Sequence, residues 1–318
     1  MNKIRLGVLY GGEHFHRNIL PAIKEIGKIN LVGLHCRKKK KIKNSLKSLY
    51  QSKKKILNNR NINTIYISSP NSHHCKNIIE ALKKNKNVIC EKPLCLNLNE
   101  FNKIKTLSLK KNKIVFEGFM YNYHDLFNYI LNLIKKREKK IKNISARFMF
   151  PHINMNNIRY KKELGGGSFY DCGCYLFKFF SSFVNYEEQI KRNLKFIHQK
   201  NFEVDTYGRL IAKKKHIKIK LEWGIGYKYF NQIIINFDNK KIIANRFFSK
   251  NINENSKIIE FFKNTKKNKF INFKKQNHFK SMFLFYINML QSKKRRNNYY
   301  KELENYQKMY LTELPYKL

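Results

Sequence analysis

The stretch NVICEKPLCLN occupies residues 87–97. Its apolar run stops at Glu91, and a lysine and a proline follow at once. Similar short apolar runs recur from Ile4 onward, namely IRLGVLY, INLVGLHC, NTIYISS and KIVFEGF, separated by amphipathic segments such as NILPAIKEI and CKNIIEALKK. Short strands that alternate with helices are typical of βαβ units in a parallel sheet buried on both faces. Residues 1–119 are therefore predicted to form a doubly wound α/β domain of the nucleotide-binding type.

The pattern changes after about Ile141. Longer alternating segments follow, such as KNISARFMF and YFNQIIINFDNKKIIANRF, and they are joined by short polar turns. They predict a large, mostly antiparallel, open sheet, and helical periodicity returns from about Asn277 to Leu314. A chain of 318 residues has room for two domains. We expect residues 120–318 to form an α+β domain for substrate binding and oligomerisation.

The chain is strongly basic, with 67 Lys and Arg against 21 Asp and Glu and a formal net charge of +46. Such a charge can attract nucleic acid, an anionic membrane or a phosphorylated ligand. The basic residues are spread over the whole chain, and their runs contain few aromatic residues. The chain is also rich in Asn, Ile, Phe and Tyr, which share A/T-rich codons with Lys. Solvated basic faces are therefore favoured over a nucleic-acid interface.

The six cysteines all lie in the first 174 residues, and none forms a CxxC pair of the kind that zinc sites use. No metal site is predicted, and a reducing cytoplasmic compartment fits best. The N-terminal apolar run is too short for a signal peptide, and the longest later run, MFLFYINML, is about half a membrane span. We expect a cytoplasmic protein with no membrane partner.

A glycine-rich segment, GVLYGGEHFH, lies between the first expected strand and the first expected helix. A dinucleotide-binding turn uses G-x-G-x-x-G so that backbone N–H groups can approach the pyrophosphate. Gly12 occupies the middle glycine position, whereas Tyr10 and Phe15 occupy the other two. Arg37 follows the second strand where an NAD-selective site usually has an acidic residue. A guanidinium suits a 2′-phosphate, so NADP(H) is the preferred cofactor and NAD(H) the alternative.

Polar residues follow the third and fourth expected strands, in YISSPNSHH and VICEKPL. Ligands of open parallel sheets bind outside the carboxyl ends of the strands, so both segments are expected at one crevice. Pro70 and Pro93 hold the chain extended there. A third cluster, ELGGGSFYDCGCYLF, has three glycines that permit close backbone approach, and it places Asp171 and Tyr175 four residues apart, on one face of a helix.

Taken together, PNxxH, EKP, FEGFMYNYH and GGGxxxDxGxY, in this order, resemble the Gfo/Idh/MocA family of glucose-fructose oxidoreductase and inositol dehydrogenase relatives. The resemblance spans nearly the whole chain. Within the family, FMYxYH, NIRY and a tyrosine after DxGx are similar to the branch with NDP-sugar 3-ketoreductases and dihydrodiol or xylose dehydrogenases. The resemblance implies an N-terminal Rossmann domain, a C-terminal α+β domain and homodimers or homotetramers.

The resemblance also implies the site residues. The catalytic residues would be Lys92, Tyr175 and Asp171. The cofactor would contact Gly12, Glu13, His14, Arg37, Ser69, Pro70, Asn71, His74, Glu91 and Lys92. The substrate would contact Lys92, Tyr121, Arg159, Asp171 and Tyr175.

These roles have a physical basis. Hydride delivery to a ketone builds negative charge on oxygen, which the Lys92 ammonium would stabilise, and Tyr175 would give or take the proton. A nearby cation favours the phenolate form of a tyrosine, and Asp171 would orient or charge-balance the pair. Three residues depart from the family pattern: Tyr10 and Phe15 in the glycine loop, and Asn122, where relatives often carry arginine. A non-glycine residue at positive φ costs about 1–3 kcal/mol, so cofactor affinity is the step these departures affect.

The expected function is an NAD(P)-dependent oxidoreductase that acts on a secondary alcohol or ketone of a sugar-like ring, with a nucleotide-linked sugar as the preferred substrate. A free-sugar or dihydrodiol dehydrogenase is the alternative within the same class. A non-catalytic member that binds nucleotide or sugar, and a nucleic-acid-binding protein, are the alternatives from other classes. Dinucleotide binding without turnover would indicate the first, and affinity that falls steeply with salt would indicate the second.

Overall fold

The computed structural model describes residues 3–36, 44–188, 190–263, 265 and 268–315. The chain divides into two compact units. The first unit comprises Met1–Phe119 and Phe279–Lys293, and the second comprises Met120–His278 and Lys294–Leu318. The sequence predicts two contiguous domains, 1–119 and 120–318, whereas in the structure a late segment completes the first unit.

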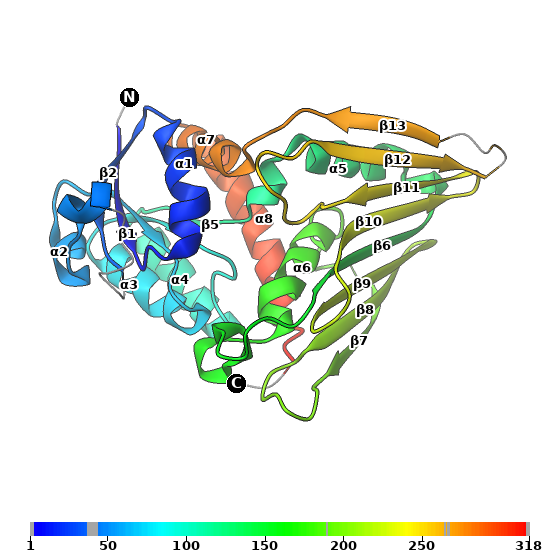
Figure 1. Cartoon of the computed structure of the whole chain (residues 1–318), viewed down its shortest axis with the longest axis horizontal. Helices are drawn as coiled ribbons and strands as arrows, with labels where there is room; N and C mark the ends of the chain where they lie inside the picture. The colour runs from blue at the N-terminus through cyan, green and yellow to red at the C-terminus, as the bar shows by residue number, and fades with distance from the viewer. Residues whose placement is uncertain (1–2, 37–43, 189, 264, 266–267, 316–318) are drawn as a thin grey trace. The chain divides into compact units, whose positions relative to one another are not determined.

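The strands of the first unit form one parallel sheet in the order β2-β1-β3-β4-β5, of which β1, β2 and β5 are labelled in Figure 1. They are β1 (Ile4–Leu9), β2 (Ile29–Leu34), β3 (Thr64–Ile67), β4 (Asn87–Cys90) and β5 (Val115–Glu117). Consecutive residues such as Ile65, Tyr66 and Ile67 are all fully buried, so both faces of the sheet are covered. This burial explains the continuous apolar runs. The doubly wound sheet predicted from the sequence is confirmed.

Helical segments connect these strands. They are η1 (Phe15–Ile19), α1 (Leu20–Lys24), α2 (Lys53–Asn58), α3 (His74–Lys83) and α4 (Leu98–Lys110). A helix from late in the chain, α7 (His278–Leu290), completes the unit. Its Lys280 Nζ atom lies 3.1 Å from the Glu25 carboxylate, and its Tyr286 ring lies 5.4 Å from that of Phe116. These contacts explain why residues 279–293 belong to the first unit.

The second unit contains an eight-stranded sheet in the order β13-β12-β11-β10-β6-β9-β8-β7. Its strands are β6 (Ile141–Phe150), β7 (Lys191–Ile197), β8 (Tyr207–Lys214), β9 (Ile217–Ile225), β10 (Phe230–Phe237), β11 (Lys240–Asn245), β12 (Ser256–Phe262) and β13 (Asn268–Phe273). The central pair β6 and β9 is parallel, and the other pairs are antiparallel. The mostly antiparallel sheet predicted from the sequence is therefore confirmed.

Every second residue of β10 is buried, as expected for a sheet with one packed and one more open face. Three helices belong mainly to this unit: α5 (Asp125–Arg137), α6 (Cys174–Phe180) and α8 (Lys293–Leu311). Phe177 of α6 packs on Trp223 of β9 with ring centroids 5.7 Å apart, and Tyr310 of α8 stacks on Phe169 at 4.5 Å. The core of the unit is thus strongly aromatic.

Among the residues that the structure describes, no helix combines the length and the apolar character needed to cross a bilayer.

Candidate functional site

The loop after β1 has one strained residue and two glycines with different environments. Tyr10 has φ = 61°, a left-handed conformation that costs a non-glycine residue about 1–2 kcal/mol. Its carbonyl accepts hydrogen bonds from the Gly12 N–H at 2.7 Å and from the Ser68 hydroxyl at 2.9 Å, which hold the turn. A Cβ on Gly11 would lie 2.4 Å from Leu34, whereas a Cβ on Gly12 would meet nothing closer than 3.9 Å. A side chain at position 11 would therefore force the buried Leu34 to shift, and the open space is beside Gly12.

Phe15 occupies the position of the third fingerprint glycine. Its side chain is fully buried, and its ring lies 6.1 Å from that of Tyr66. The helical segment after the loop includes a π-helical turn, Phe15–Ile19. The core of the first unit therefore accommodates this large residue instead of the close helix–strand contact that glycine would allow.

The residues after β3 are tied to the fourth strand through His74. Its imidazole is fully buried, with Nδ1 2.7 Å from the Pro93 carbonyl and Nε2 2.9 Å from the Ser69 carbonyl. Burial lowers the pKa of His74 despite these two carbonyl oxygens. Both ring nitrogens thus face the backbone carbonyls of two loops, and the contact of His74 with the cofactor stays a prediction. Pro70 and Asn71 are partly exposed beside it.

Glu91 links three segments of the first unit. It accepts a hydrogen bond from the Tyr66 hydroxyl at 2.5 Å, and the Nε2 atom of His14 lies 3.2 Å from the same carboxylate oxygen. Burial alone would raise the pKa of Glu91, but His14 and the Tyr66 hydrogen bond outweigh it and lower the pKa below its ordinary value. Glu91 is therefore an anchored carboxylate that joins β3, β4 and the segment after the glycine loop.

Lys92 follows in a turn that is fixed on both sides. On one side of Lys92, the Glu91 carboxylate is held by the Tyr66 hydroxyl. On the other side, the backbone N–H of Leu94 donates to the buried Glu117 carboxylate at 2.7 Å. The Lys92–Pro93 peptide bond is cis. Lys92 is half-buried at the carboxyl edge of the sheet, where ligands of doubly wound sheets bind.

The residues of this edge fit a dinucleotide. Gly12 faces open space, Glu13 and the half-buried His14 begin the helical segment after it, and Asn71 and Lys92 follow the ends of β3 and β4. Backbone N–H groups at the start of a helix suit phosphate oxygens. Arg37, on which the preference for NADP(H) rests, lies outside the described residues.

In the second unit, the glycine run closes around a short helical turn, η7 (Ile158–Tyr160). Gly166 donates to the Lys161 carbonyl at 3.0 Å, and Gly167 donates to the Arg159 carbonyl at 2.8 Å. A Cβ on Gly166 would lie 2.6–2.8 Å from three backbone carbonyl oxygens, so no other residue fits there. The run therefore holds Arg159 against the segment that carries Asp171.

Arg159 and Asp171 form an ion pair. Arg159 Nε donates to Asp171 Oδ2 at 2.6 Å, and the Arg159 guanidinium also donates to Asn157 at 3.3 Å. Asp171 raises the pKa of Arg159 further above its ordinary value, against the opposing effect of burial. Asp171 lies on the π-helical segment η9 (Phe169–Gly173), directly before α6, which carries Tyr175. The structure thus brings together two of the residues expected at the substrate site.

Tyr175 lies in an aromatic group with Tyr121, Phe148 and Phe248, at centroid distances of 5.6, 5.2 and 6.4 Å. The Tyr121 hydroxyl donates to the Tyr175 backbone carbonyl at 2.8 Å, and Tyr121 is almost fully buried. The Tyr121 hydroxyl thus supports the helix of Tyr175, and the contact of Tyr121 with the substrate stays a prediction. Asn122 has a buried Oδ1 atom for which the described residues provide no hydrogen-bond partner.

Asp205 is a supporting residue that the sequence patterns do not reveal. Its fully buried carboxylate accepts from the Ser168 hydroxyl at 2.5 Å and from the Phe169 N–H at 2.8 Å. It therefore caps the start of the segment that carries Asp171 and Tyr175. Ser168 is a recognisable capping residue, but its partner lies 37 positions away, beyond the reach of a local pattern.

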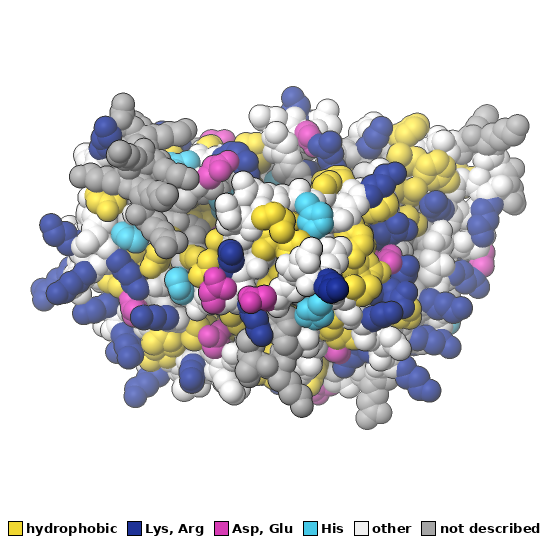
Figure 2. Space-filling view, turned by 60° about the horizontal axis from the view of Figure 1, so that its bottom comes forward, with side chains coloured by type: hydrophobic (Ala, Val, Ile, Leu, Met, Phe, Trp, Pro, Cys, Tyr) yellow, Lys and Arg dark blue, Asp and Glu magenta, His cyan; other side chains and the backbone are white. Residues whose placement is uncertain are grey.

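The described residues contain no group of three His, Cys, Asp or Glu side chains able to hold a metal ion. All six cysteines are buried, and none forms a disulfide. Figure 2 shows Lys and Arg side chains scattered over the face in view, with Asp and Glu among them, rather than gathered in one patch.

Residues 7–119 match the family model described as an oxidoreductase family with an NAD-binding Rossmann fold. The match confirms, for this part of the chain, the resemblance stated above.

Three relatives illustrate the similarity. A dTDP-3,4-didehydro-2,6-dideoxy-α-D-glucose 3-reductase of Saccharopolyspora spinosa is 27% identical over 180 residues, which cover 54% of this chain and 53% of the reductase. The reductase of the same name from Actinomadura kijaniata is 21% identical, with 78% and 76% covered. A trans-1,2-dihydrobenzene-1,2-diol dehydrogenase of Xenopus laevis is 27% identical, with 53% and 52% covered. The chain thus spans only about half the length of two of these relatives.

Two solved structures have the same fold. KijD10, a 3-ketoreductase from Actinomadura kijaniata in complex with NADP and TDP-benzene, has a TM-score of 0.87 at 18% identity, with 97% of this chain and 96% of that chain covered. An aldose-aldose oxidoreductase from Caulobacter crescentus has a TM-score of 0.80 at 16% identity, with the same coverage of both chains. Named relatives and solved neighbours alike are oxidoreductases.

Proposed function

We propose that this protein is an NAD(P)-dependent oxidoreductase acting on a secondary alcohol or ketone of a sugar-like substrate, because residues 7–119 match the model of an oxidoreductase family with an NAD-binding Rossmann fold. The observation that carries the proposal is the fixed turn after β4. The Tyr66–Glu91 and Glu117–Leu94 hydrogen bonds hold the backbone on both sides of Lys92. One lysine is thereby positioned at the carboxyl edge of a nucleotide-binding sheet, whereas most lysines of this basic chain are on solvated surfaces.

A bound nicotinamide would supply or accept the hydride. The Lys92 ammonium stabilises the negative charge that develops on the carbonyl oxygen, and the Tyr175 hydroxyl donates the proton. In the oxidative direction, the same hydroxyl accepts the proton. Asp171 and Arg159, paired at 2.6 Å, fix the start of the helix that carries Tyr175 and give the substrate a guanidinium to bind.

NADP(H) is the proposed cofactor, with NAD(H) as the alternative. The open space beside Gly12 supports dinucleotide binding on the helix that begins at Glu13. The KijD10 structure that this fold resembles contains NADP, and a similar D-xylose 1-dehydrogenase of Haloferax volcanii is named for NADP(+). Glu91 and His14 lie at the same edge and are proposed contacts, together with the residues after β3, namely Ser69, Pro70, Asn71 and His74.

The proposed substrate is a nucleotide-linked keto-sugar. Support comes from the names of the two dTDP-sugar 3-reductases among the relatives. Within this chain, the buried amide oxygen of Asn122 can accept a hydrogen bond from a sugar hydroxyl. The Arg159 side chain, which is 39% exposed, offers a guanidinium. The dihydrodiol and xylose dehydrogenases among the relatives support the alternative of a smaller, unlinked substrate.

We further propose that residues 1–119 form the dinucleotide-binding domain and that residues 120–318 bind the substrate and form the oligomer. The open face of the eight-stranded sheet supports a homodimer or homotetramer. Six buried cysteines that form no disulfide support a reducing cytoplasmic location.

The test measures both the consumption and the binding of NADPH by the purified chain. NADPH consumption is followed by absorbance with a dTDP-linked 3-keto-sugar, a free aldose and a dihydrodiol as separate substrates. Turnover of the dTDP-linked sugar supports the full proposal, and turnover of another substrate alone supports the oxidoreductase but not its substrate. NADPH binding without turnover of any carbonyl or alcohol would favour a non-catalytic member. Because binding driven by net charge falls steeply with salt, a second salt concentration separates specific from nonspecific affinity.

A further inference from the structure

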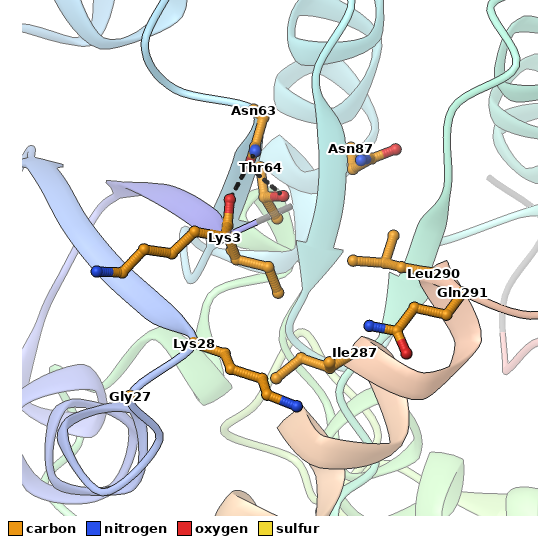
Figure 3. A pocket seen from close by; sticks show the side chains of 10 residues that line it. Lys3, Gly27, Lys28, Asn63, Thr64, Asn87, Ile287, Leu290 and Gln291 are labelled. Atoms are coloured by element: carbon orange, nitrogen blue, oxygen red, sulfur yellow. Dashed lines mark hydrogen bonds between the residues drawn. The ribbon is translucent and has the colours of Figure 1, made fainter. Parts of the chain in front are cut away.

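A cavity of about 740 Å³ lies in the first unit at the edge opposite Lys92 (Figure 3). It is lined by the first residues of three adjacent strands, Ile4 of β1, Thr64 of β3 and Asn87 of β4. The last turn of α7 closes another side. Because parallel strands place their amino ends at one edge and their carboxyl ends at the other, this cavity is separate from the proposed cofactor site.

The floor of the cavity is apolar. Ile4 and Ile287 are almost fully buried and expose only their edges to it, and Leu290 of α7 adds a partly exposed side chain. Pockets that bind small organic molecules have volumes of roughly 300–1,000 Å³ and mostly apolar walls with a few polar groups. The cavity therefore has the size and the floor for the apolar part of such a molecule.

The polar lining supplies donors and positive charge but no carboxylate. Lys3 and Lys28 line the cavity, and neither pairs with an acidic side chain of the described residues. Asn87 uses its Oδ1 atom to accept from the Ile114 N–H at 2.9 Å, which leaves its amide nitrogen as a donor. Gln291 is an exposed amide at the end of α7. In Figure 3, Lys28 extends toward Ile287 and Gln291, whereas the Lys3 ammonium points away from them.

The surroundings of the cavity add to its positive charge. Lys86 directly precedes β4, and its Nζ atom donates to the carbonyls of Asn59 and Ile62 at 2.8 and 2.6 Å. Burial lowers the pKa of Lys86, and the positive charges of Arg5 and Lys113 lower it further. Lys86 is the neighbour of the lining residue Asn87, so it adds a basic side chain near this edge, and basic surroundings favour an anionic ligand.

We propose that this cavity binds a small aliphatic carboxylate, whose chain covers Ile4, Ile287 and Leu290 and whose carboxylate pairs with Lys28. The amide of Gln291, toward which Lys28 extends in Figure 3, supplies a further donor. The charge-assisted bond to Lys28 fixes the end of the ligand that carries the charge, and the apolar floor selects a hydrocarbon body over a bare inorganic anion. Such a ligand bridges the strand ends and α7 and so stabilises the attachment of α7 to the sheet.

The test is isothermal titration calorimetry of the full chain with octanoate, octylammonium and inorganic phosphate. The expected result is saturable binding of octanoate and no binding of octylammonium. Thermal unfolding in the presence of octanoate should show an increased melting temperature. Lys28→Glu should weaken octanoate binding by at least about tenfold, since it replaces an attractive charge with a repulsive one. Lys54→Glu, which makes the same charge change at an exposed position outside the cavity, should leave the affinity unchanged.

Three results would overturn the inference: no saturable octanoate binding, equal affinity in Lys28→Glu, or equal binding of octylammonium. Phosphate binding as tight as that of octanoate would also contradict it, because the apolar floor would then contribute nothing. None of these readouts depends on enzymatic activity, so the inference stands or fails separately from the proposed function.

Discussion

The Nε atom of Arg159 donates to the Oδ2 atom of Asp171 at 2.6 Å, and a glycine run that tolerates no side chain at Gly166 maintains this pair. Asp171 is one helical turn before Tyr175. The negative charge of Asp171 is therefore partly balanced within its own unit by Arg159, rather than being wholly available to balance a lysine or a tyrosine. We propose that its main effect on Tyr175 is to fix the start of the helix, which directly follows the segment of Asp171.

Asp171→Asn should weaken the pair while keeping the shape of the side chain. Turnover is expected to fall by about 10- to 100-fold, and the free energy of unfolding by about 1–2 kcal/mol, because Arg159 loses its counter-charge. Steady-state kinetics and urea unfolding measure the two effects. Asp238→Asn is the matched control: Asp238 pairs with Lys142 on the surface and is 72% exposed, so little change is expected. Unchanged turnover in Asp171→Asn would mean that the pair has no functional part.

Lys92→Met and Tyr175→Phe should each lower turnover by at least about 100-fold, the usual contribution of general acid–base and electrostatic catalysis. NADPH affinity should change by less than about threefold, because neither substitution removes the open space beside Gly12. Lys110→Met, on the exposed end of α4, controls for the loss of one positive charge. Full activity in either variant removes that residue from the mechanism.

Gly166→Ala should destabilise the second unit by several kcal/mol, on the order of an overpacked core position, because the new Cβ would meet three carbonyl oxygens at 2.6–2.8 Å. Gly27→Ala is the matched control, since a Cβ there meets nothing within 4 Å. Thermal unfolding of both variants gives the comparison. Equal melting temperatures would show that the loop relaxes readily and does not hold Arg159 in place.

A buried basic cluster in the second unit predicts how stability depends on pH. The Nδ1 atom of His124 accepts from the Leu126 N–H at 3.0 Å, its Nε2 atom contacts Lys250, and Lys250 also contacts Ser256. Burial, then Lys250, lowers the pKa of His124 to about 3, and the same two causes lower that of His278 to about 4. Burial lowers the pKa of Lys250 to about 8.

Because the unfolded chain binds protons to these histidines near pH 6.5 and the folded chain does not, stability should fall as pH drops from about 6.5 toward 4. His124→Asn keeps a helix-capping side chain and should flatten this fall in melting temperature. His216→Asn, at an exposed position, should leave it unchanged. The same acid sensitivity in His124→Asn as in the natural chain would assign the effect to other groups.

The parallel sheet and the position of Lys92 were predictable, because they depend on local patterns. Apolar runs buried on both faces, punctuated by Glu91 and Pro93, indicate strand ends without any long-range information. The glycine loop was harder. The conformation of Tyr10 follows from its fingerprint position, but the choice of Gly11 as the packing glycine depends on Leu34, in another strand.

Other features depend on contacts between distant segments. The attachment of α7 to the first unit rests on pairs such as Glu25 with Lys280, which no periodicity encodes. His74 and Tyr121 match family motifs, but their hydrogen bonds to backbone carbonyls of distant segments could not be predicted from those motifs. Asp205 belongs to no sequence motif. Its hydrogen bond from Ser168 joins residues 37 positions apart and forms only when the second unit folds.

The central claim is that this chain binds a nicotinamide dinucleotide although Tyr10 and Phe15 replace two fingerprint glycines. The most direct measurement is a titration of the purified protein with NADPH and with NADH, followed by nicotinamide fluorescence at two salt concentrations. We predict saturable binding that is tighter for NADPH and persists at the higher salt. If neither nucleotide binds, the loop is closed to the cofactor, and the assignment as an NAD(P)-dependent oxidoreductase is wrong.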